Sequence, residues 1–155
     1  MKPSVAFILG FSIFILALII YAYILMSILH SNNSSNINRI RAVVEIGNID
    51  YNVFYADNNS SREIGLMNYT NFSLDGIVGE YFSFNNYSEL CFWMKNTPEP
   101  LYQIWIADNR SIFIYNATPY SLRVVCHYGN AVLEIYKNLN IEIEKNETIK
   151  IVKID

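Results

Sequence analysis

The sequence predicts a small, mainly β domain, an antiparallel sandwich or barrel with one short helix, that follows a single N-terminal transmembrane helix. Two observations lead to this fold class. Of the 25 residues 5–29, 22 are apolar and none is charged. The rest of the 155-residue chain holds about eight short runs of β-branched and aromatic residues at roughly ten-residue intervals, which is typical of all-β domains.

The N-terminal run is long enough to cross a bilayer. A helix over residues 5–29 would rise about 37 Å, against a hydrocarbon core of about 30 Å. The run is longer than the apolar region of a secretory signal peptide and contains no A-x-A cleavage site, so an uncleaved signal anchor is favoured over a cleaved signal. Lys2 precedes the run and favours an N-terminus inside the cell. We therefore expect a cytoplasmic segment 1–4, an anchor 5–29 and a polar stalk 30–40.

Asparagine is abundant, and its placement predicts N-glycosylation. Ten of the 19 Asn residues open an N-x-[ST] triplet, and all ten follow the apolar run. Chance pairing at this composition gives about two, so we expect a domain outside the cell membrane that carries N-linked glycans. The ten acceptor candidates are Asn32, Asn33, Asn58, Asn59, Asn68, Asn71, Asn86, Asn109, Asn116 and Asn146.

The chain has two cysteines, Cys91 and Cys126. In an oxidising compartment they could form a disulfide, which chain-entropy arguments value at roughly 4 kcal/mol for a loop of this length. Two buried free thiols are the alternative.

The extracytoplasmic domain is expected to span residues 41–155 and to begin with a hairpin. Two β-branched runs, 41–46 and 49–56, are separated by Gly47 and Asn48, which are typical turn residues. The sequence of residues 60–63 has the S-x-x-E form of a capping box and predicts one short helix that ends near Met67.

Further strands follow a turn at Asp75 and Gly76. Pro98 and Pro100 break the chain, so residues 95–100 are expected to form a loop. The remaining predicted strands are 77–84, 89–94, 101–107, 111–115, 122–126, 131–136 and 148–154.

Four sequence segments resemble a known family. REIGLM at 62–67, FWMKNT at 92–97, PL at 100–101 and VLE at 132–134 resemble, in order and spacing, the core of the domain of unknown function 192 family. The resemblance implies a compact β fold, often exported or membrane-anchored, without an established enzymatic activity or ligand. Together with the glycosylation triplets, it implies an archaeal cell surface.

The chain departs from the family pattern at two places. Tyr102 replaces the usual Asp of P-L-D, and Asn146-Glu147 replaces a Gly-Asp turn. A role that requires the Asp carboxylate is therefore in doubt here, since the neighbouring Gln103 carries no charge.

Five polar residues are candidates for ligand binding: Arg62, Lys95, Asn96, Thr97 and Glu134. The three residues 95–97 follow a strand and precede two prolines, the kind of loop that a rigid β scaffold presents to a ligand. Each also has a structural interpretation. Asn and Thr satisfy loop backbone groups, Lys95 could pair with Glu134 or Glu63, and Arg62 could brace the loop.

Other kinds of site are not expected. A zinc site needs four N or S ligands, and Cys91, Cys126 and His127 supply only three. His127 is the one plausible base for a catalytic triad, without a nucleophile motif, and no phosphate-binding loop or dinucleotide fingerprint is present. The net charge of −3 does not suit nucleic-acid binding. We expect no metal, no cofactor and no catalytic residue.

The leading functional hypothesis is a non-catalytic, membrane-anchored domain outside the cell, an accessory or binding subunit of a surface or membrane assembly. Its expected partners are the lipid bilayer through residues 5–29, N-linked glycans and a membrane or surface protein. The alternative is a small-molecule or carbohydrate-binding protein, or a weak hydrolase, with its site at the loop of residues 95–97.

Overall fold

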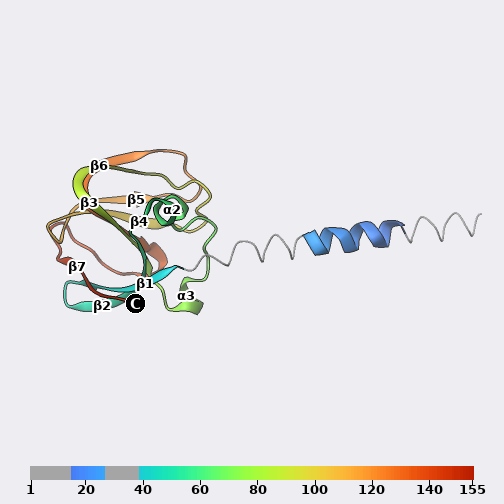
Figure 1. Ribbon diagram of the computed structural model, residues 1–155, viewed down its shortest axis with the longest axis horizontal. Coiled ribbons are helices and arrows are strands. Elements are labelled where there is room, and N and C mark those ends of the chain that lie inside the picture. Colours follow the sequence, from blue (N-terminus) through green and yellow to red (C-terminus); the bar gives the residue numbers. More distant parts are fainter. Residues whose placement is uncertain (1–14, 27–38) are drawn as a thin grey trace, which may run out of the picture. The chain divides into compact units, whose positions relative to one another are not determined.

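The structure is a computed structural model that describes residues 15–26 and 39–155 (Figure 1). Residues 15–26 form a helix whose side chains are exposed, and Arg39–Asp155 form a compact unit. Within these two ranges, no helix combines the length and the apolar character needed to cross a membrane. The predicted segment 1–4, most of the stalk, both ends of the predicted anchor, Asn32 and Asn33 lie outside the described residues.

The folded unit is built around one seven-stranded sheet with the strand order β5-β4-β6-β3-β2-β1-β7. The prediction of a β domain is confirmed. The strands are β1 (Ile40–Ile46), β2 (Ile49–Ala56), β3 (Gly79–Phe92), β4 (Leu101–Ala107), β5 (Arg110–Ala117), β6 (Val125–Tyr136) and β7 (Ile149–Ile154).

The two edges of the sheet meet, so the sheet closes into a barrel and not a sandwich. Arg110 at the start of β5 forms a β-bridge with Thr148, immediately before β7. The N–H of Ser111 donates to the carbonyl of Glu147 (2.9 Å), and the N–H of Ile149 donates to the carbonyl of Asn109 (2.8 Å). This contact covers the start of β5 and the residues just before β7, so part of each sheet edge is protected from pairing with other chains.

The sheet is not wholly antiparallel, in contrast to the prediction, because β2 and β3 pair in parallel. Parallel neighbours require a crossover connection, and residues 57–78 supply it. The crossover contains two short helices, α2 (Asn59–Ile64) and α3 (Phe72–Asp75), where one helix was predicted. The capping box is formed by Asn58 and Ser61 and not by the predicted residues 60–63. The Asn58 side chain accepts a hydrogen bond from the Ser61 N–H, and the Ser61 hydroxyl accepts one from the Asn58 N–H.

Two strands are longer than predicted. β3 has 14 residues and β6 has 12, and each replaces two predicted strands. The polar residues inside β3, which resemble a turn in the sequence, lie at an irregularity in the pairing between Ser83 and Ser88, and the strand continues beyond it. A 3-10 turn, η1 (Lys137–Leu139), follows β6.

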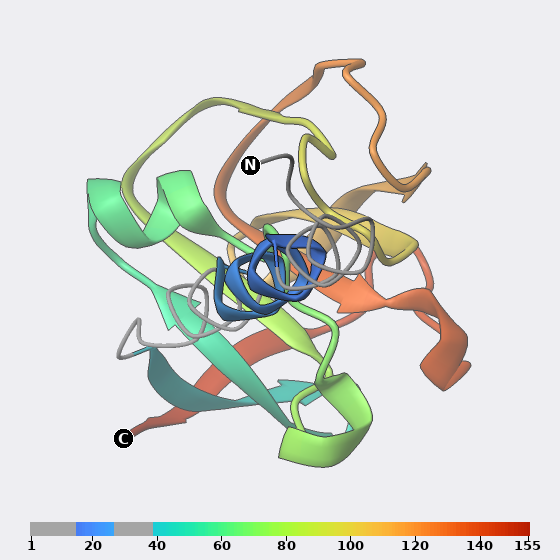
Figure 2. The same cartoon turned by 90° about the vertical axis from the view of Figure 1, so that its right-hand side faces the viewer.

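Apolar side chains fill both faces of the curved sheet. The barrel interior is packed with residues from six strands, among them Val44, Val53, Ile104, Leu133 and Ile149. On the outer face of β3, β6 and β4, two further clusters lie beneath the crossover and the loop of residues 93–100. Figure 2 shows the same domain from the side, with α2 at the upper left and α3 at the lower right. The candidate residues belong to this covered outer face.

Candidate functional site

The structure brings three of the five predicted site residues together. Arg62, Thr97 and Glu134 line one small cavity on the outer face of the barrel, next to Trp93. The cavity has a volume of about 40 Å³, which suits one or two water molecules but not a sugar or a substrate of that size. Lys95 and Asn96 do not line it.

Arg62 acts as a brace between α2 and β3. Its Nε donates to the carbonyl of Ser83 (2.9 Å), Nη2 to the carbonyl of Asp57 (2.6 Å) and Nη1 to Oδ1 of Asn59 (3.2 Å). The guanidinium also lies 4.5 Å from the centre of the Phe84 ring. Since these contacts engage all three guanidinium nitrogens, the structural interpretation of Arg62 is the better one.

The loop of residues 95–97 is held mainly by its own backbone. Thr97 is buried, and its hydroxyl and its N–H donate to the carbonyls of Lys95 (3.3 Å) and Met94 (3.1 Å). Asn96 adopts a left-handed conformation with φ of 55°, and its carbonyl accepts from the N–H of Asn68 (2.8 Å). Such contacts orient a loop and leave little of it for a ligand.

The predicted pairing of Lys95 with Glu134 or Glu63 is wrong. Among the described residues, the ion pairs do not include Lys95. Its ammonium instead lies 5.0 Å from the centre of the Trp93 ring, on the surface. Glu134 is buried and accepts a hydrogen bond from Nε2 of Gln103 (2.9 Å), so it is fixed by a neutral partner.

A row of buried polar side chains crosses three adjacent strands on this face. Glu80 in β3, Glu134 in β6 and Gln103 in β4 are direct neighbours in the strand register, and all three are buried. Arg39, just before β1, reaches the outer end of the row, where its Nη1 lies 3.3 Å from Oε2 of Glu80. The Arg39 guanidinium also stacks over Phe54 at 4.9 Å.

Burial dominates the electrostatics of this row. Burial raises the pKa of Glu134 to about 7, and the hydrogen bond from Gln103 acts in the opposite direction. Burial also raises the pKa of Glu80, to about 8; the charge of Arg39 opposes this increase, and the charge of Glu134 adds to it. Each carboxyl therefore binds a proton more tightly than an exposed glutamate does.

Sequence reasoning missed Glu80 and Arg39. Arg39 lies in a segment whose composition does not set it apart, and Glu80 becomes a neighbour of Glu134 only once the β3–β6 register is known. A glutamate within the apolar run of residues 77–84 was the one available signal. A buried charge is costly unless it has a partner, so its presence suggests a second polar residue across the sheet.

The row is not accompanied by a cluster of metal ligands in the described part of the chain. In residues 15–26 and 39–155, no group of three or more His, Cys, Asp or Glu side chains is placed to hold a metal ion. Glu134 lines the cavity of about 40 Å³, which suits water molecules and not a substrate. Their arrangement can bind and share protons and can fix the strands in register.

Two of the segments that resemble the family, residues 62–67 and 92–97, pack against each other. Leu66 and Met94, one from each motif, are buried in the same outer cluster. Gly65 has φ of 48°, and a Cβ atom there would lie 3.3 Å from Cζ of Phe82, so glycine suits both the backbone and the space. The motifs thus have a clear structural role.

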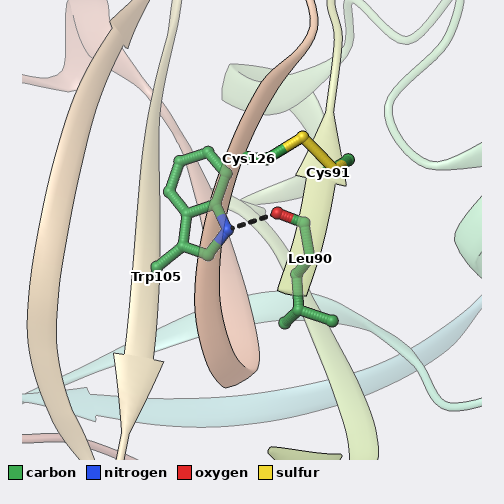
Figure 3. Close-up of a disulfide and its surroundings, with 4 residues drawn as sticks. All are labelled: Leu90, Cys91, Trp105 and Cys126. Carbon is green, nitrogen blue, oxygen red and sulfur yellow. Dashed lines mark hydrogen bonds between the residues drawn. A yellow bond between two sulfur atoms is a disulfide. The ribbon is translucent and has the colours of Figure 1, made fainter. Parts of the chain in front are cut away.

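The two cysteines form a disulfide between β3 and β6, as one of the two sequence alternatives predicted (Figure 3). Cys91 and Cys126 are register partners, and the indole N–H of Trp105 donates to the carbonyl of Leu90 (2.9 Å) beside the bridge. The bridge lies at the base of two loops, residues 93–100 and 118–124.

These two loops carry an exposed apolar surface, which we call the loop patch: Trp93, Tyr120, Leu122 and Val124. Their exposed fractions are 42%, 63%, 69% and 55%. The loops are joined by hydrogen bonds from the N–H of Met94 to the carbonyl of Ser121 and from the N–H of Tyr120 to the carbonyl of Thr97, both 3.0 Å. Both lie in the upper half of the view in Figure 2. Sequence reasoning did not identify this patch, because its members come from separate segments.

All eight glycosylation candidates in the described part of the chain are exposed: Asn58, Asn59, Asn68, Asn71, Asn86, Asn109, Asn116 and Asn146. Their exposure makes these side chains accessible for modification. Three of them, Asn68, Asn109 and Asn146, have positive φ and therefore lie in turns.

Comparison with known proteins gives a family but no activity. The sequence model of DUF192, a family described as uncharacterized, matches residues 37–151. No curated protein matches the chain. The structure is similar to a "putative transcription regulator" from Sinorhizobium meliloti, with a TM-score of 0.65 and 25% identity over 76% of this chain and 98% of that one. It is also similar to a protein of unknown function from Novosphingobium aromaticivorans, with a TM-score of 0.62 and 26% identity over 71% of this chain and 84% of that one.

Proposed function

Because the chain belongs to the DUF192 family, for which no function is known, we propose its function from its own sequence and surface. It is a non-catalytic β domain, anchored to the cell membrane with its C-terminal domain outside, that binds a partner protein through the loop patch. The single observation that carries this proposal is the exposure of Trp93 and Tyr120 on two loops that are held together at their base by a disulfide.

The loop patch has the composition and stiffness of a binding surface. Tryptophan and tyrosine are enriched among the residues that dominate protein–protein affinity. Tyr120 has φ of 57°, an uncommon conformation for a bulky residue, and such backbone strain is more often kept at functional sites than elsewhere. Since the two loops are hydrogen-bonded to each other, little conformational entropy remains to be lost on binding.

The charges beside the patch indicate an acidic partner. Lys95 is stacked on Trp93, and Arg123 lies between two patch residues with its guanidinium 5.7 Å from the centre of the Tyr115 ring. The chain as a whole has 11 basic and 14 acidic residues, so these cations differ in sign from the molecule's net charge. A partner with acidic groups around an apolar centre would complement this surface.

Nucleic acid is not the proposed partner. The net charge of −3 gives no broad basic footprint. The description of one structural neighbour as a transcription regulator therefore does not supply a role for this chain.

The extracytoplasmic location has three independent supports. The apolar run of residues 5–29 is long enough for an anchor. The disulfide suits an oxidising compartment. The exposed Asn residues of the glycosylation triplets are accessible to a glycosyl transferase. The archaeal cell surface inferred from the family resemblance remains part of the same proposal.

The proposal can be tested on the full chain, purified in mild detergent from the membranes of its own host. We expect a complex with one acidic protein in fixed stoichiometry. The double substitution Trp93→Ala with Lys95→Glu should release that protein, whereas Leu74→Ala, which removes a more exposed apolar side chain from α3, should retain it. A monomer in every preparation would contradict the proposal, and so would a complex that the double substitution leaves intact. A homodimer without another protein would contradict the proposal that the partner is a different, acidic protein.

A further inference from the structure

A second hollow lies at one end of the barrel, away from the residues predicted from the sequence. Its volume is about 530 Å³, within the range of about 300–1,000 Å³ that is usual for small-molecule sites. It is formed by β4, β5, η1 and the segment that follows η1. Its floor and its rim differ in chemistry.

The floor of the hollow is apolar and continuous with the barrel interior. Ile114, Ile141 and Ile143 line it, and these half-buried side chains pack against the interior core. The hollow is therefore the part of the barrel mouth that core side chains leave open. An apolar floor of this kind favours a ligand with a nonpolar face.

An aromatic ring and a held cation form one wall. Tyr102 packs against the interior core and faces the hollow, and Nζ of Lys137 lies 5.6 Å from the centre of its ring. The same ammonium donates to Oδ1 of Asn116 (3.0 Å), which is the register partner of Tyr102 in β5. Lys137 is thus shared between a ring and an amide and is only partly available to a ligand.

Internal hydrogen bonds hold the opposite wall in place. The hydroxyl of the buried Ser111 donates to the carbonyl of Glu144 (2.6 Å) and accepts from the N–H of Glu147 (2.9 Å). On the rim, Nδ2 of Asn138 donates to the Tyr136 hydroxyl (2.9 Å), and the N–H of Asn140 donates to the carbonyl of Lys137 (3.2 Å). The hollow is therefore largely formed before a ligand arrives.

We infer that this hollow binds a neutral sugar or an amino sugar through one pyranose ring. The nonpolar face of such a ring fits Tyr102 and the isoleucine floor, and its hydroxyls match the amides of Asn138 and Asn140. The carboxylates of Glu142 and Glu144 on the rim favour a hydroxyl-rich or ammonium-bearing ligand and disfavour an anion.

The sugar has two possible sources. It can be a free or surface-bound saccharide, or it can be the first residue of a glycan attached to Asn116, whose side chain already contacts Lys137 at the rim. The chemistry of recognition is the same in both cases. The inference is independent of the loop patch, which involves other residues.

The first experiment uses the full chain made without glycosylation, with its disulfide formed, in a detergent whose headgroup is not a sugar. Glucose, glucosamine, N-acetylglucosamine and glucuronate are titrated and followed by saturation-transfer NMR. We expect saturation by at least one of the first three, with a Kd in the millimolar range, and weaker binding of glucuronate.

Three variants locate the site. Tyr102→Ala and Glu142→Gln should each weaken binding about tenfold, and Asn140→Gly should also weaken it while tolerating the left-handed backbone at that position (φ 53°). Asn140→Gly and Glu142→Gln alter exposed side chains and keep the proposal testable if Tyr102→Ala fails to fold. Tyr128→Ala, at an exposed tyrosine that does not line the hollow, is the control and should bind like the parent.

The second experiment separates the sources by repeating the titration on glycosylated protein. If the Asn116 glycan fills the hollow, the glycosylated parent binds no added sugar, and Asn116→Gln restores binding. If the ligand is free, the glycosylated parent binds like the unglycosylated chain. The inference is overturned if no sugar binds the unglycosylated chain at concentrations on the order of tens of millimolar. Preferential glucuronate binding, or binding that all three site variants retain, also overturns it.

Discussion

Replacing Glu134 by glutamine should change how the stability of the domain depends on pH. Burial raises the pKa of this carboxyl from 4.5 to about 7 in the folded protein. The folded state therefore binds the proton more tightly than the unfolded state does. The contribution to stability is fully present below the unfolded pKa and is lost as the pH rises through the folded value.

The magnitude follows from the shift. Between 4.5 and about 7, at about 1.4 kcal/mol for each pKa unit, the loss for this one group is about 3 kcal/mol between pH 4 and pH 8. Glutamine keeps an oxygen that can accept the hydrogen bond from Gln103 but has no proton to lose. Glu134→Gln should therefore be about as stable as the parent at pH 4 and more stable by up to about 3 kcal/mol at pH 8.

The assay is chemical denaturation of the disulfide-intact chain at a series of pH values between 4 and 8, followed by tryptophan fluorescence, since Trp105 is fully buried. Glu89→Gln, at an exposed glutamate on β3, controls for the loss of a charge. If the difference in unfolding free energy between Glu134→Gln and the parent were the same at pH 4 and pH 8, the assigned burial effect would be wrong. Glu80→Gln should show the same direction, because the pKa of Glu80 is also raised, to about 8.

Three further predictions concern stability and modification. Gly79→Ala should unfold the domain or lower its unfolding free energy by more than about 3 kcal/mol, because a Cβ atom there would lie 1.8 Å from the Glu134 carbonyl oxygen. Gly76→Ala, where the space is open, should lower it by only about 1 kcal/mol because of the positive φ at that position. Equal melting temperatures of the two variants would contradict this prediction. Reduction of the Cys91–Cys126 disulfide should lower the unfolding free energy by roughly 4 kcal/mol, measured by denaturation with and without reductant, and an unchanged midpoint would show that the bridge does not stabilise the fold. Protein from its own host should have a mass above that of the polypeptide, 18.0 kDa, and lose the excess on chemical deglycosylation; an unmodified mass would reject the glycoprotein proposal.

Local signals predicted the hairpin, whereas features that depend on distant segments were missed. The turn at Gly47 and Asn48 joins β1 and β2 as expected, since the turn residues and the flanking β-branched runs are adjacent in the sequence. By contrast, the parallel pairing of β2 with β3 depends on how residues 57–78 cross the sheet. No local pattern encodes that path.

In the candidate site, too, the approximate location could be predicted from the sequence, whereas the individual contacts could not. The positions of Arg62 and Thr97 beside one cavity agree with a common location for the two motifs. Hydrogen bonds from both side chains, however, go to backbone carbonyls, those of Ser83 and Lys95, which every residue type supplies and which a sequence cannot distinguish. The barrel-mouth hollow was missed for a related reason, because Tyr102 and Ile143 meet only when the barrel is closed.

The place of β7 in the sheet has a consequence for the timing of folding. β1, the first strand of the domain, lies between β2 and β7, so Val44 and Ile46 gain their second neighbours only when residues near the C-terminus arrive. Pairing over so long a separation in sequence slows folding, and the barrel cannot close before residues 149–154 have been synthesised. If the domain is exported as proposed, it crosses the membrane without a finished barrel. It would then fold only after residues 149–154 have reached the far side.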